Sequence, residues 1–169
     1  MRNRTLIAGI IFAISFSVSI GSSLASRVQR TPISELSPLS YSVTQLGGTE
    51  TPYDNPYWDN HAVGIYVDII DGTPLFSSLD KYDSDTGWPT FARPINRNNI
   101  VKQDDTTGGI LRDEIRSRRS GSHLGHLFDD GPIEYAGVRY CMNSAALRFI
   151  PFANMRSEWY VAYMRLLRK

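Results

Sequence analysis

The segment Gly137–Pro151 reads GVRYCMNSAALRFIP and contains two short apolar runs. Residues 137–142 and 147–151 are candidate strands, since short apolar and aromatic runs favour extended backbone, although the second pattern is weaker. Cys141, the only cysteine in the chain, lies near the end of the first run. One thiol forms neither an internal disulfide nor a multi-cysteine zinc site, so Cys141 is either a buried small hydrophobe or a reactive thiol.

The rest of the chain body shows the same preference for strands. Residues 64–70 alternate apolar and other side chains with period two, which predicts a half-buried strand, and residues 74–76 are a further candidate. The sequence DDTTGG at 104–109 predicts a hairpin or loop tip. Helices are expected at 38–46 and at 155–167, where apolar residues fall at helical spacing. These patterns predict a mainly β fold with small helical ends.

The N-terminus has the pattern of a secretory signal peptide. Arg2 and Arg4 precede the apolar run Leu6–Ile20, and small residues follow up to Ala25. We expect residues 1–25 to be a signal peptide cleaved after Ala25, which makes the protein secreted or periplasmic. The apolar run has 15 residues, against roughly 20 for a membrane span. An uncleaved N-terminal membrane anchor is the alternative.

The remaining chain is long enough for one compact domain. Residues 26–40 are polar with two prolines and are interpreted as a linker, which leaves 41–169 as the catalytic domain. The full chain has a net charge of +1, and loss of Arg2 and Arg4 leaves 16 basic and 17 acidic residues. This balance does not indicate nucleic acid or an anionic surface as a partner.

The neighbours of Cys141 favour a reactive thiol. A thiolate is stabilised by nearby cations and hydrogen-bond donors. Arg139 lies two residues earlier, on the same face of the expected strand, and Asn143 follows if that strand continues. His123 and His126 would come close to Cys141 after a hairpin return. A cysteine and a histidine also suit a cysteine hydrolase, so this pair alone does not identify the reaction.

Six blocks of sequence, in order, resemble the methionine-R-sulfoxide reductase B family, MsrB/SelR. They lie within residues 49–151 and read TETPYDNPYWDN, GIYVDIIDGTPLFSSLDKYDS, GWPTF, RDEIRS, SHLGHLFDDGP and GVRYCMNSAALRFIP. The GWPTF and RYCMNSAALRF blocks are highly specific. The resemblance implies a fold of two antiparallel β-sheets with small peripheral helices, in agreement with the strand-rich pattern.

The resemblance also implies an activity, the reduction of the R epimer of methionine sulfoxide to methionine, each epimer needing its own enzyme. Cys141 would be the nucleophile, and its attack on the sulfoxide sulfur would leave a sulfenic acid. His126 is expected to supply the proton to the oxygen. His123 and Asn143 are expected to fix substrate, water and thiol.

Three further residues are expected at the substrate. Trp88 of GWPTF offers a flat apolar face for the substrate methyl group, and Phe149 is expected to help close that pocket. Arg139 is expected on the substrate side of the thiol. The structural alternatives are that Trp88 is a core aromatic residue and that His123 and His126 are metal ligands or buried core residues.

The chain departs from the family at the position of the resolving cysteine. Many members carry that cysteine just before the Gly-Trp pair, where this chain has Thr86. Because no second cysteine exists, the sulfenic acid of Cys141 would need an external thiol, such as a thioredoxin-like domain or glutathione. We expect no cofactor and a monomer whose substrate is an oxidised methionine in a peptide or protein.

A second departure concerns zinc. Many members bind zinc through two CxxC pairs, at positions that correspond here to Asp68, Asp71, Ser117 and Ser120. Carboxylates and hydroxyls do not replace four thiolates around zinc. The sequence therefore predicts a member without metal. Two functional alternatives stay open: a catalytically silent module that binds methionine sulfoxide, and a cysteine hydrolase.

Overall fold

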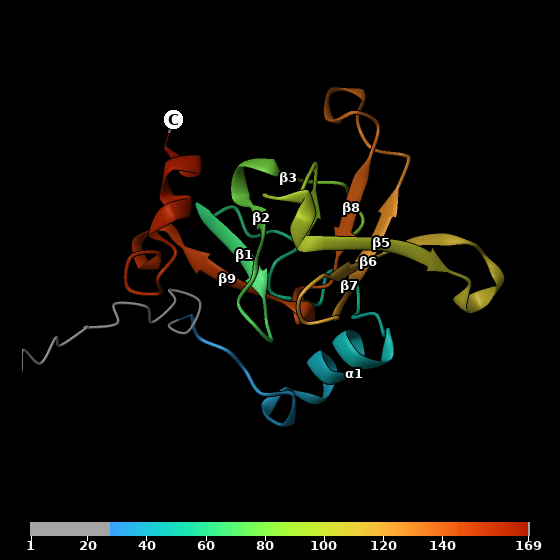
Figure 1. The fold of residues 1–169 in the computed structure, drawn as a ribbon. Coiled ribbons are helices and arrows are strands. Elements are labelled where there is room, and N and C mark those ends of the chain that lie inside the picture. Colours follow the sequence, from blue (N-terminus) through green and yellow to red (C-terminus); the bar gives the residue numbers. More distant parts are fainter. Residues whose placement is uncertain (1–27, 169) are drawn as a thin grey trace, which may run out of the picture.

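The computed structural model describes residues 28–168, so the predicted signal peptide lies outside the described residues. Two antiparallel sheets form the body of the protein (Figure 1). The smaller has the order β2-β1-β9, with β1 at Gly64–Asp68, β2 at Pro74–Ser77 and β9 at Leu147–Pro151. The larger has the order β3-β4-β8-β7-β6-β5. Its strands are β3 Lys81–Tyr82, β4 Thr90–Phe91, β5 Ile100–Asp105, β6 Arg112–Ser117, β7 His123–Phe128 and β8 Arg139–Met142. The mainly β fold with two antiparallel sheets is confirmed.

The helices are short and lie outside the sheets. The α-helix α1, Pro38–Leu46, agrees with the predicted range. Ser37 caps it by accepting the backbone N–H of Ser40, Pro38 opens its first turn, and Gly47 ends it in the left-handed conformation. Short 3₁₀ turns occur at Ile33–Glu35, Ser78–Asp80, Arg97–Asn99, Thr107–Gly109, Ile133–Tyr135, Ser144–Ala146, Phe152–Asn154 and Val161–Leu167. No helix within residues 28–168 has the length and apolar character to cross a membrane.

The strand β1 differs from its prediction in one respect. It ends at Asp68, and all five of its residues are buried rather than only one face. The reason is that β1 is the central strand of its sheet and both faces are covered. Tyr66 packs on one side into the larger core, whereas Ile65 and Val67 belong to a second cluster on the other side.

The larger core lies between the two sheets. Phe76 of β2 stacks on Phe91 of β4 with ring centroids 4.5 Å apart, and Tyr140 of β8 packs against Phe76. This core fixes the six-stranded sheet, which carries Cys141 and both histidines, against the three-stranded sheet. The site therefore rests on a packed scaffold rather than on loops.

The predicted helix at 155–167 is wrong over its first half. Residues 155–159 form turns, and only Val161–Leu167 is helical, as a 3₁₀ segment. Trp159 has a φ of +68°, which ends any right-handed helix at that point. Met155 and Tyr160 are buried in the second cluster. The apolar spacing over 155–167 therefore marked neither a continuous helix nor a uniformly buried face, since Trp159 and Leu166 are exposed.

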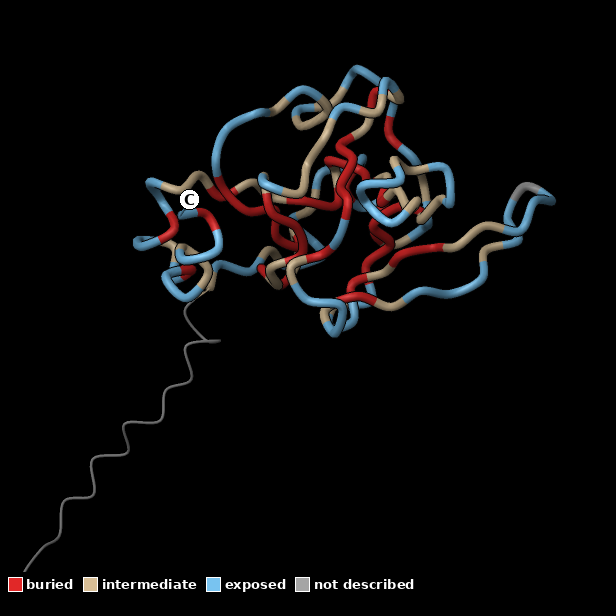
Figure 2. The backbone as a smooth tube through the Cα atoms, turned by 90° about the horizontal axis from the view of Figure 1, so that it is seen from above, coloured by how far each residue is buried: buried red, intermediate tan, exposed pale blue. Residues whose placement is uncertain are grey.

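The loop tip predicted at 104–109 is confirmed. The strand β5 runs through Asp105, a 3₁₀ turn follows at Thr107–Gly109, and β6 returns from Arg112. This hairpin projects away from the body of the protein (Figures 1 and 2). Toward the N-terminus, α1 begins at Pro38. The expected boundary between a linker at 26–40 and a catalytic domain at 41–169 stays a prediction.

Candidate active site

Strand register places Cys141 beside His126. In the six-stranded sheet, Cys141 is paired with Thr90 on one side and with His126 on the other, and His126 is paired in turn with Glu114. Residues directly opposite one another in antiparallel strands point to the same face. The thiol, the imidazole and the carboxylate therefore form one row across the three strands β8, β7 and β6. The hairpin return expected to bring a histidine to the cysteine is the β7–β8 pair.

A β-bulge brings His123 to the same face. Two residues three apart in a regular strand point to opposite faces. In β7, however, Gly125 is paired with Ile115 and His123 with Arg116, so one extra residue of β7 lies between these pairs. The rings of His123 and His126 consequently meet edge to face with centroids 5.3 Å apart.

A small cavity opens beside Cys141. It has a volume of about 120 Å³ and is lined by Thr49, Trp88, Arg112, Gly125, His126, Phe128, Cys141, Met142 and Asn143. Sites for whole small molecules are typically ~300–1,000 Å³. The cavity therefore suits one side chain rather than a whole ligand. Trp88 forms part of its wall, and its indole N–H donates to the backbone oxygen of Glu50 at 3.1 Å.

The thiol of Cys141 is partly buried. Burial raises its pKa, and this outweighs the positive charge of Arg139 and the hydrogen bonds of Thr86 and Thr90, which act in the opposite direction. The Thr86 hydroxyl lies 3.9 Å from the sulfur. The expected help from Arg139 is thus present, but the resting group is a thiol rather than a thiolate at neutral pH.

Arg139 lies outside the wall of this cavity. It makes two hydrogen bonds to the Asp130 carboxylate, at 2.7 and 2.9 Å, and its guanidinium lies over the Phe128 ring, 4.3 Å from the centroid. Its side chain lines a separate hollow of about 400 Å³ that it shares with Thr86. Arg139 therefore acts on the thiol from outside the cavity that Trp88 lines.

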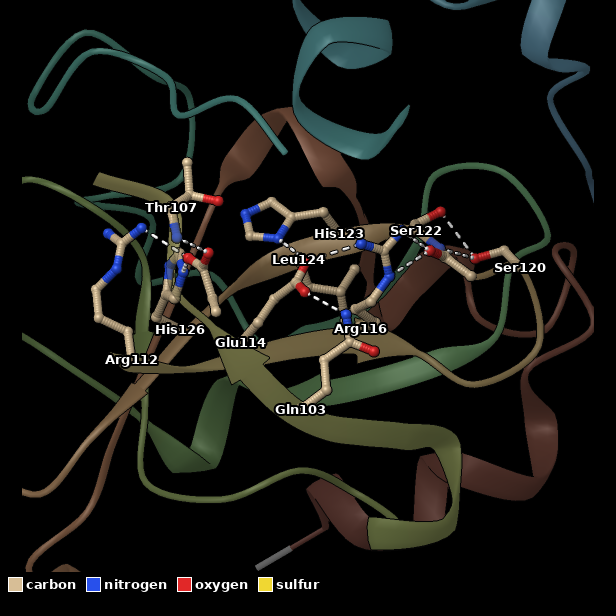
Figure 3. A network of polar contacts seen from close by, with 12 residues as sticks. Gln103, Thr107, Arg112, Glu114, Arg116, Ser120, Ser122, His123, Leu124 and His126 are labelled. Carbon is tan, nitrogen blue, oxygen red and sulfur yellow. Dashed lines mark hydrogen bonds and ion pairs between the residues drawn. The ribbon is translucent and has the colours of Figure 1, made fainter. Parts of the chain in front are cut away.

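Both histidines are held by carboxylates. His126 Nε2 lies 2.8 Å from Asp105 Oδ2, and His123 Nδ1 lies 2.6 Å from Glu114 Oε1 (Figure 3). His123 is only 2% exposed and does not line the cavity. Burial lowers the pKa of His123, more than its bond to Glu114 raises it. Of the two, His126 is the histidine with access to a bound substrate.

The remaining predicted residues have different surroundings. Asn143 lines the cavity, but its amide is used internally: it donates to the Leu124 oxygen and accepts from the Glu50 N–H, both at 3.1 Å. Phe149 does not line the cavity. It lies on β9 and packs against Tyr66, with ring centroids 4.9 Å apart, in the core between the sheets. Its side chain is thus placed for packing and not for closing the pocket.

Sequence reasoning missed the carboxylates. Asp105 and Glu114 were not singled out, although Arg112, Glu114 and Arg116 alternate along RDEIRS, which is the signal of a shared polar strand face. Glu50 was also missed. It is buried, which raises its pKa, and it accepts the backbone N–H groups of residues 144 and 145 at 2.5 and 2.7 Å. Glu50 therefore fixes the turn that follows β8.

A larger cavity lies elsewhere in the described part of the chain. It measures about 660 Å³, and its lining comes from residues 71–74, 98–99, 118–119 and 159–163, together with Val28. Its lining contains no cysteine and no histidine. Size alone would select this cavity, but the nucleophile and the imidazole lie in the smaller one, which is the better candidate for a reaction.

The positions of the family's zinc ligands also form one corner of the fold. Asp68 Oδ2 accepts the Ser120 hydroxyl at 2.6 Å, and Asp71 lies 3.3 Å from Arg119. The other oxygen of Asp68 accepts the N–H groups of Ile70 and Asp71. The Asp68 carboxylate is occupied by protein donors, whereas Asp71 Oδ2 is in an ion pair with Arg119 but accepts no hydrogen bond. The set lacks the sulfur and nitrogen ligands that zinc prefers. The corner does not fit a zinc ion.

Comparison with known proteins agrees with this geometry. A family model for the SelR domain matches residues 36–151, which is more than half of the chain. A protein of Vibrio cholerae serotype O1, named peptide methionine sulfoxide reductase MsrA/MsrB, is 56% identical over 134 residues, 79% of this chain and 35% of that protein. The match thus spans about a third of that relative's length. The chain belongs to the SelR family, the methionine-R-sulfoxide reductases of the B class that its sequence blocks resemble.

Proposed function

We propose that this protein is an oxidoreductase that reduces the R epimer of methionine sulfoxide in peptides and proteins. The family and the name of the Vibrio cholerae relative support methionine sulfoxide as the substrate. The observation that carries the proposal is the cavity beside Cys141, where a thiol, an imidazole and an indole face a space that suits one side chain. Three such fixed contacts are what a site needs to distinguish the two epimers of a chiral sulfoxide.

In the proposed reaction the sulfur of Cys141 attacks the sulfoxide sulfur. The S–O bond of the substrate breaks, and oxygen is transferred to the cysteine sulfur. The substrate sulfur gains two electrons and leaves as a thioether, while Cys141 becomes a sulfenic acid. One proton is lost by the thiol and one is gained by the oxygen, so the step is balanced without a cofactor.

His126 is the proposed acid that protonates the oxygen, since it lines the cavity and is the cross-strand partner of Cys141. Trp88 would hold the substrate methyl group. Asn143 would act indirectly. Its amide donates to the backbone oxygen of Leu124 in β7 and accepts from the backbone N–H of Glu50, and so would hold these two segments together. The pKa of the thiol is raised by burial, so proton removal must accompany substrate binding or attack.

Regeneration requires two equivalents of an external thiol. The first attacks the sulfenic acid and releases water, which leaves a mixed disulfide at Cys141, and the second releases the enzyme thiol and an external disulfide. Thr86, 3.9 Å from the sulfur, cannot form a disulfide in place of this reductant. We propose a thioredoxin-like domain or glutathione as the donor, and a monomer acting outside the cytoplasm after signal-peptide removal.

The test is turnover of the separated R and S epimers of a methionine sulfoxide peptide, with dithiothreitol as reductant. We expect loss of the R epimer alone. Cys141→Ser is the control, because serine is nearly isosteric but a far weaker nucleophile, and it should abolish turnover while the circular dichroism spectrum stays unchanged.

Two results would contradict the proposal. Turnover of the S epimer at a similar rate would show that the pocket does not distinguish the epimers, which contradicts the proposed selectivity. Selective binding of the R epimer without turnover by any thiol would instead identify a silent binding module on this scaffold.

A further inference from the structure

Two parallel trios of side chains lie side by side on the six-stranded sheet. In the first, Asp105 Oδ2 accepts from Arg112 Nη2 at 2.7 Å and lies 2.8 Å from His126 Nε2. The second is built in the same way from Glu114, Arg116 and His123. Glu114 Oε1 accepts from Arg116 Nη1 at 2.8 Å and lies 2.6 Å from His123 Nδ1 (Figure 3). Each imidazole is thus held by a carboxylate that an arginine holds in turn.

Both carboxylates are ionised at neutral pH. Hydrogen bonds from Thr107 and His126 hold the pKa of Asp105 well below its ordinary value. Burial acts to raise the pKa of Glu114, but the bonds from His123 and Gln103 and the charge of Arg116 bring it below its ordinary value. An ionised carboxylate only accepts hydrogen bonds. The imidazole nitrogen that faces each carboxylate must therefore carry the proton.

This requirement gives the two histidines opposite tautomers. In its neutral form His126 carries its proton on Nε2, so that Nδ1 is unprotonated. His123 carries its proton on Nδ1, so that Nε2 is unprotonated. The Nε2 of His123 is buried and has no hydrogen-bond partner in the structure. The two rings therefore present different nitrogens for any further contact, although both come from one strand.

We infer that Asp105 and Glu114 are positioning residues that lock His126 and His123 into opposite tautomers, and that the β5–β6 hairpin is thereby part of the active site. The inference rests on the proposed function where it assigns His126 a role in proton transfer. The tautomers themselves follow from the contacts alone. Neither carboxylate lines the cavity, so both act through the imidazoles.

The hairpin carries the whole of the first trio. Asp105 ends β5, Arg112 begins β6, and the backbone N–H of Thr107 donates to Asp105 Oδ1 at 2.8 Å across the turn between them. Arg112 also forms part of the cavity wall. A change in the tip would therefore be transmitted to the cavity through two fixed bonds of Asp105, one to Arg112 and one to His126.

The locked tautomer has a chemical consequence for His126. When His126 is protonated, Asp105 keeps the Nε2 proton, so the proton available for transfer is the one on Nδ1. After transfer the ring is again the Nε2–H tautomer and needs no rotation before the next cycle. The ionisable groups around His126 are Asp105, Arg112, Glu114, His123 and Cys141, from β5, β6, β7 and β8.

The test is the ring ¹⁵N spectrum of the full chain, about two pH units above the ordinary histidine pKa. The protein has only three histidines, so His61→Gln and His126→Gln assign the signals. We expect the Nε2–H pattern for His126 and the Nδ1–H pattern for His123. The exposed His61 should show averaging between the two. Averaged or identical patterns for His123 and His126 in the unmodified protein would overturn the inference.

The variant Asp105→Ala removes the acceptor at Nε2, and Asp104→Ala is its matched control, since Asp104 is exposed on the same strand. We expect Asp105→Ala to lose the fixed tautomer of His126 while that of His123 is retained, and Asp104→Ala to change neither. An unchanged His126 pattern in a folded Asp105→Ala protein would show that Asp105 does not position the ring. The spectrum of the unmodified chain decides the matter if that variant does not fold.

Kinetics separates this inference from the proposed function. We expect Asp105→Ala to lower kcat by about 10–100-fold with little change in KM, less than the ~10²–10⁴-fold expected for loss of the acid itself. His126→Ala provides that upper limit. If the tautomer is lost but kcat is unchanged, Asp105 positions His126 as inferred, and the proton-transfer role of His126 in the proposed function is wrong.

Discussion

At the scale of single residues, Cys141 is subject to two opposing influences. Burial removes water from the sulfur and disfavours the thiolate, whereas Arg139 and the hydroxyls of Thr86 and Thr90 favour it. Burial is the larger effect, so the pKa of the thiol lies above its ordinary value. A thiol kept protonated at rest is less reactive toward oxidants and disulfides.

This balance predicts a slow reaction of Cys141 with iodoacetamide at neutral pH. A raised pKa lowers the thiolate fraction at pH 7, and the rate should increase only as the pH passes the ordinary thiol value. We expect a rate at pH 7 that is roughly several-fold below that of free cysteine, and slower still with a bulky maleimide. Because Cys141 is the only cysteine, mass spectrometry between pH 6 and 11 reports it alone. An inflection of the rate at a lower pH than in the denatured chain would show that the effect of Arg139 on the thiol pKa exceeds that of burial.

At the scale of elements, the bulge in β7 determines which side chains share one face of the sheet at the site. Its Gly125 has a φ of +152°, and a Cβ built there would lie 2.2 Å from the backbone oxygen of Cys141. No side chain fits in that space without displacing β8. Glycine is therefore required both by the backbone conformation and by the close approach of the strand that carries the nucleophile.

We expect Gly125→Ala to destabilise the protein by about 2–5 kcal/mol, from backbone strain together with the steric clash. Gly121→Ala is the control. Gly121 also has a positive φ, +75°, but the space beside it is open, so strain alone should cost about 1–2 kcal/mol. Denaturant unfolding of both variants measures the difference. Equal effects would mean that the β7–β8 contact yields easily, and the bulge would then not constrain the position of Cys141.

The buried carboxyl of Asp68 gives a further prediction. Burial raises its pKa, against the hydrogen bond from Ser120. Below the ordinary aspartate pKa both states are protonated. As the pH rises above it the unfolded chain ionises first, so this carboxyl lowers the free energy of unfolding until its raised value is passed. Asp68→Asn cannot ionise and keeps an acceptor for the N–H of Ile70.

We therefore expect the stability of Asp68→Asn, relative to the unmodified protein, to increase from pH 4 to pH 7. Guanidinium unfolding at the two pH values measures it. Asp104→Asn, at an exposed position, should stay within about 0.5 kcal/mol of the unmodified protein. A relative stability that falls with pH would show that the ionised carboxylate is held favourably by its donors, and that burial is not the dominant cost at Asp68.

These elements also show what the sequence can predict. Apolar alternation identified β1, and short apolar runs identified β2, β8 and, more weakly, β9, because each packs on the core between the sheets. These patterns did not identify β5, whose residues Lys102, Gln103 and Asp104 are exposed on a projecting hairpin. The motifs located Cys141 and both histidines, but their common face depends on a bulge that no period-two pattern contains. The carboxylates behind the histidines follow from register alone.

At the scale of the whole molecule, two cores share the strands β1 and β9, since Leu147 of β9 belongs to the core between the sheets and Ile150 to the second cluster. Tyr66 of β1 points into the core between the sheets, which supports the active site, while Ile65 and Val67 point into the second cluster. That cluster is closed by the C-terminal segment: Met155 and Tyr160 are fully buried, and the Tyr160 hydroxyl donates to the Gly72 oxygen at 2.9 Å. The two ends of the described chain meet there, since Val28 packs on the same cluster.

This division predicts that the second cluster stabilises the fold without tuning the reaction. None of its residues lines the cavity beside Cys141. Met155→Ala should lower the free energy of unfolding by about 2–5 kcal/mol, because the packed site is expected to leave a cavity. The control Val161→Ala, at a residue 47% exposed, should cost less than about 0.5 kcal/mol.

The measurement that tests this division is kcat and KM of both variants, well below the Tm of Met155→Ala, beside their unfolding curves. We expect unchanged constants with a lowered Tm, because strain at the C-terminal segment must cross the three-stranded sheet and a packed aromatic core before it reaches β8. A fall in kcat in the folded Met155→Ala protein would mean that the three-stranded sheet transmits changes between the two cores. The C-terminal segment would then be part of the catalytic unit and not only of its support.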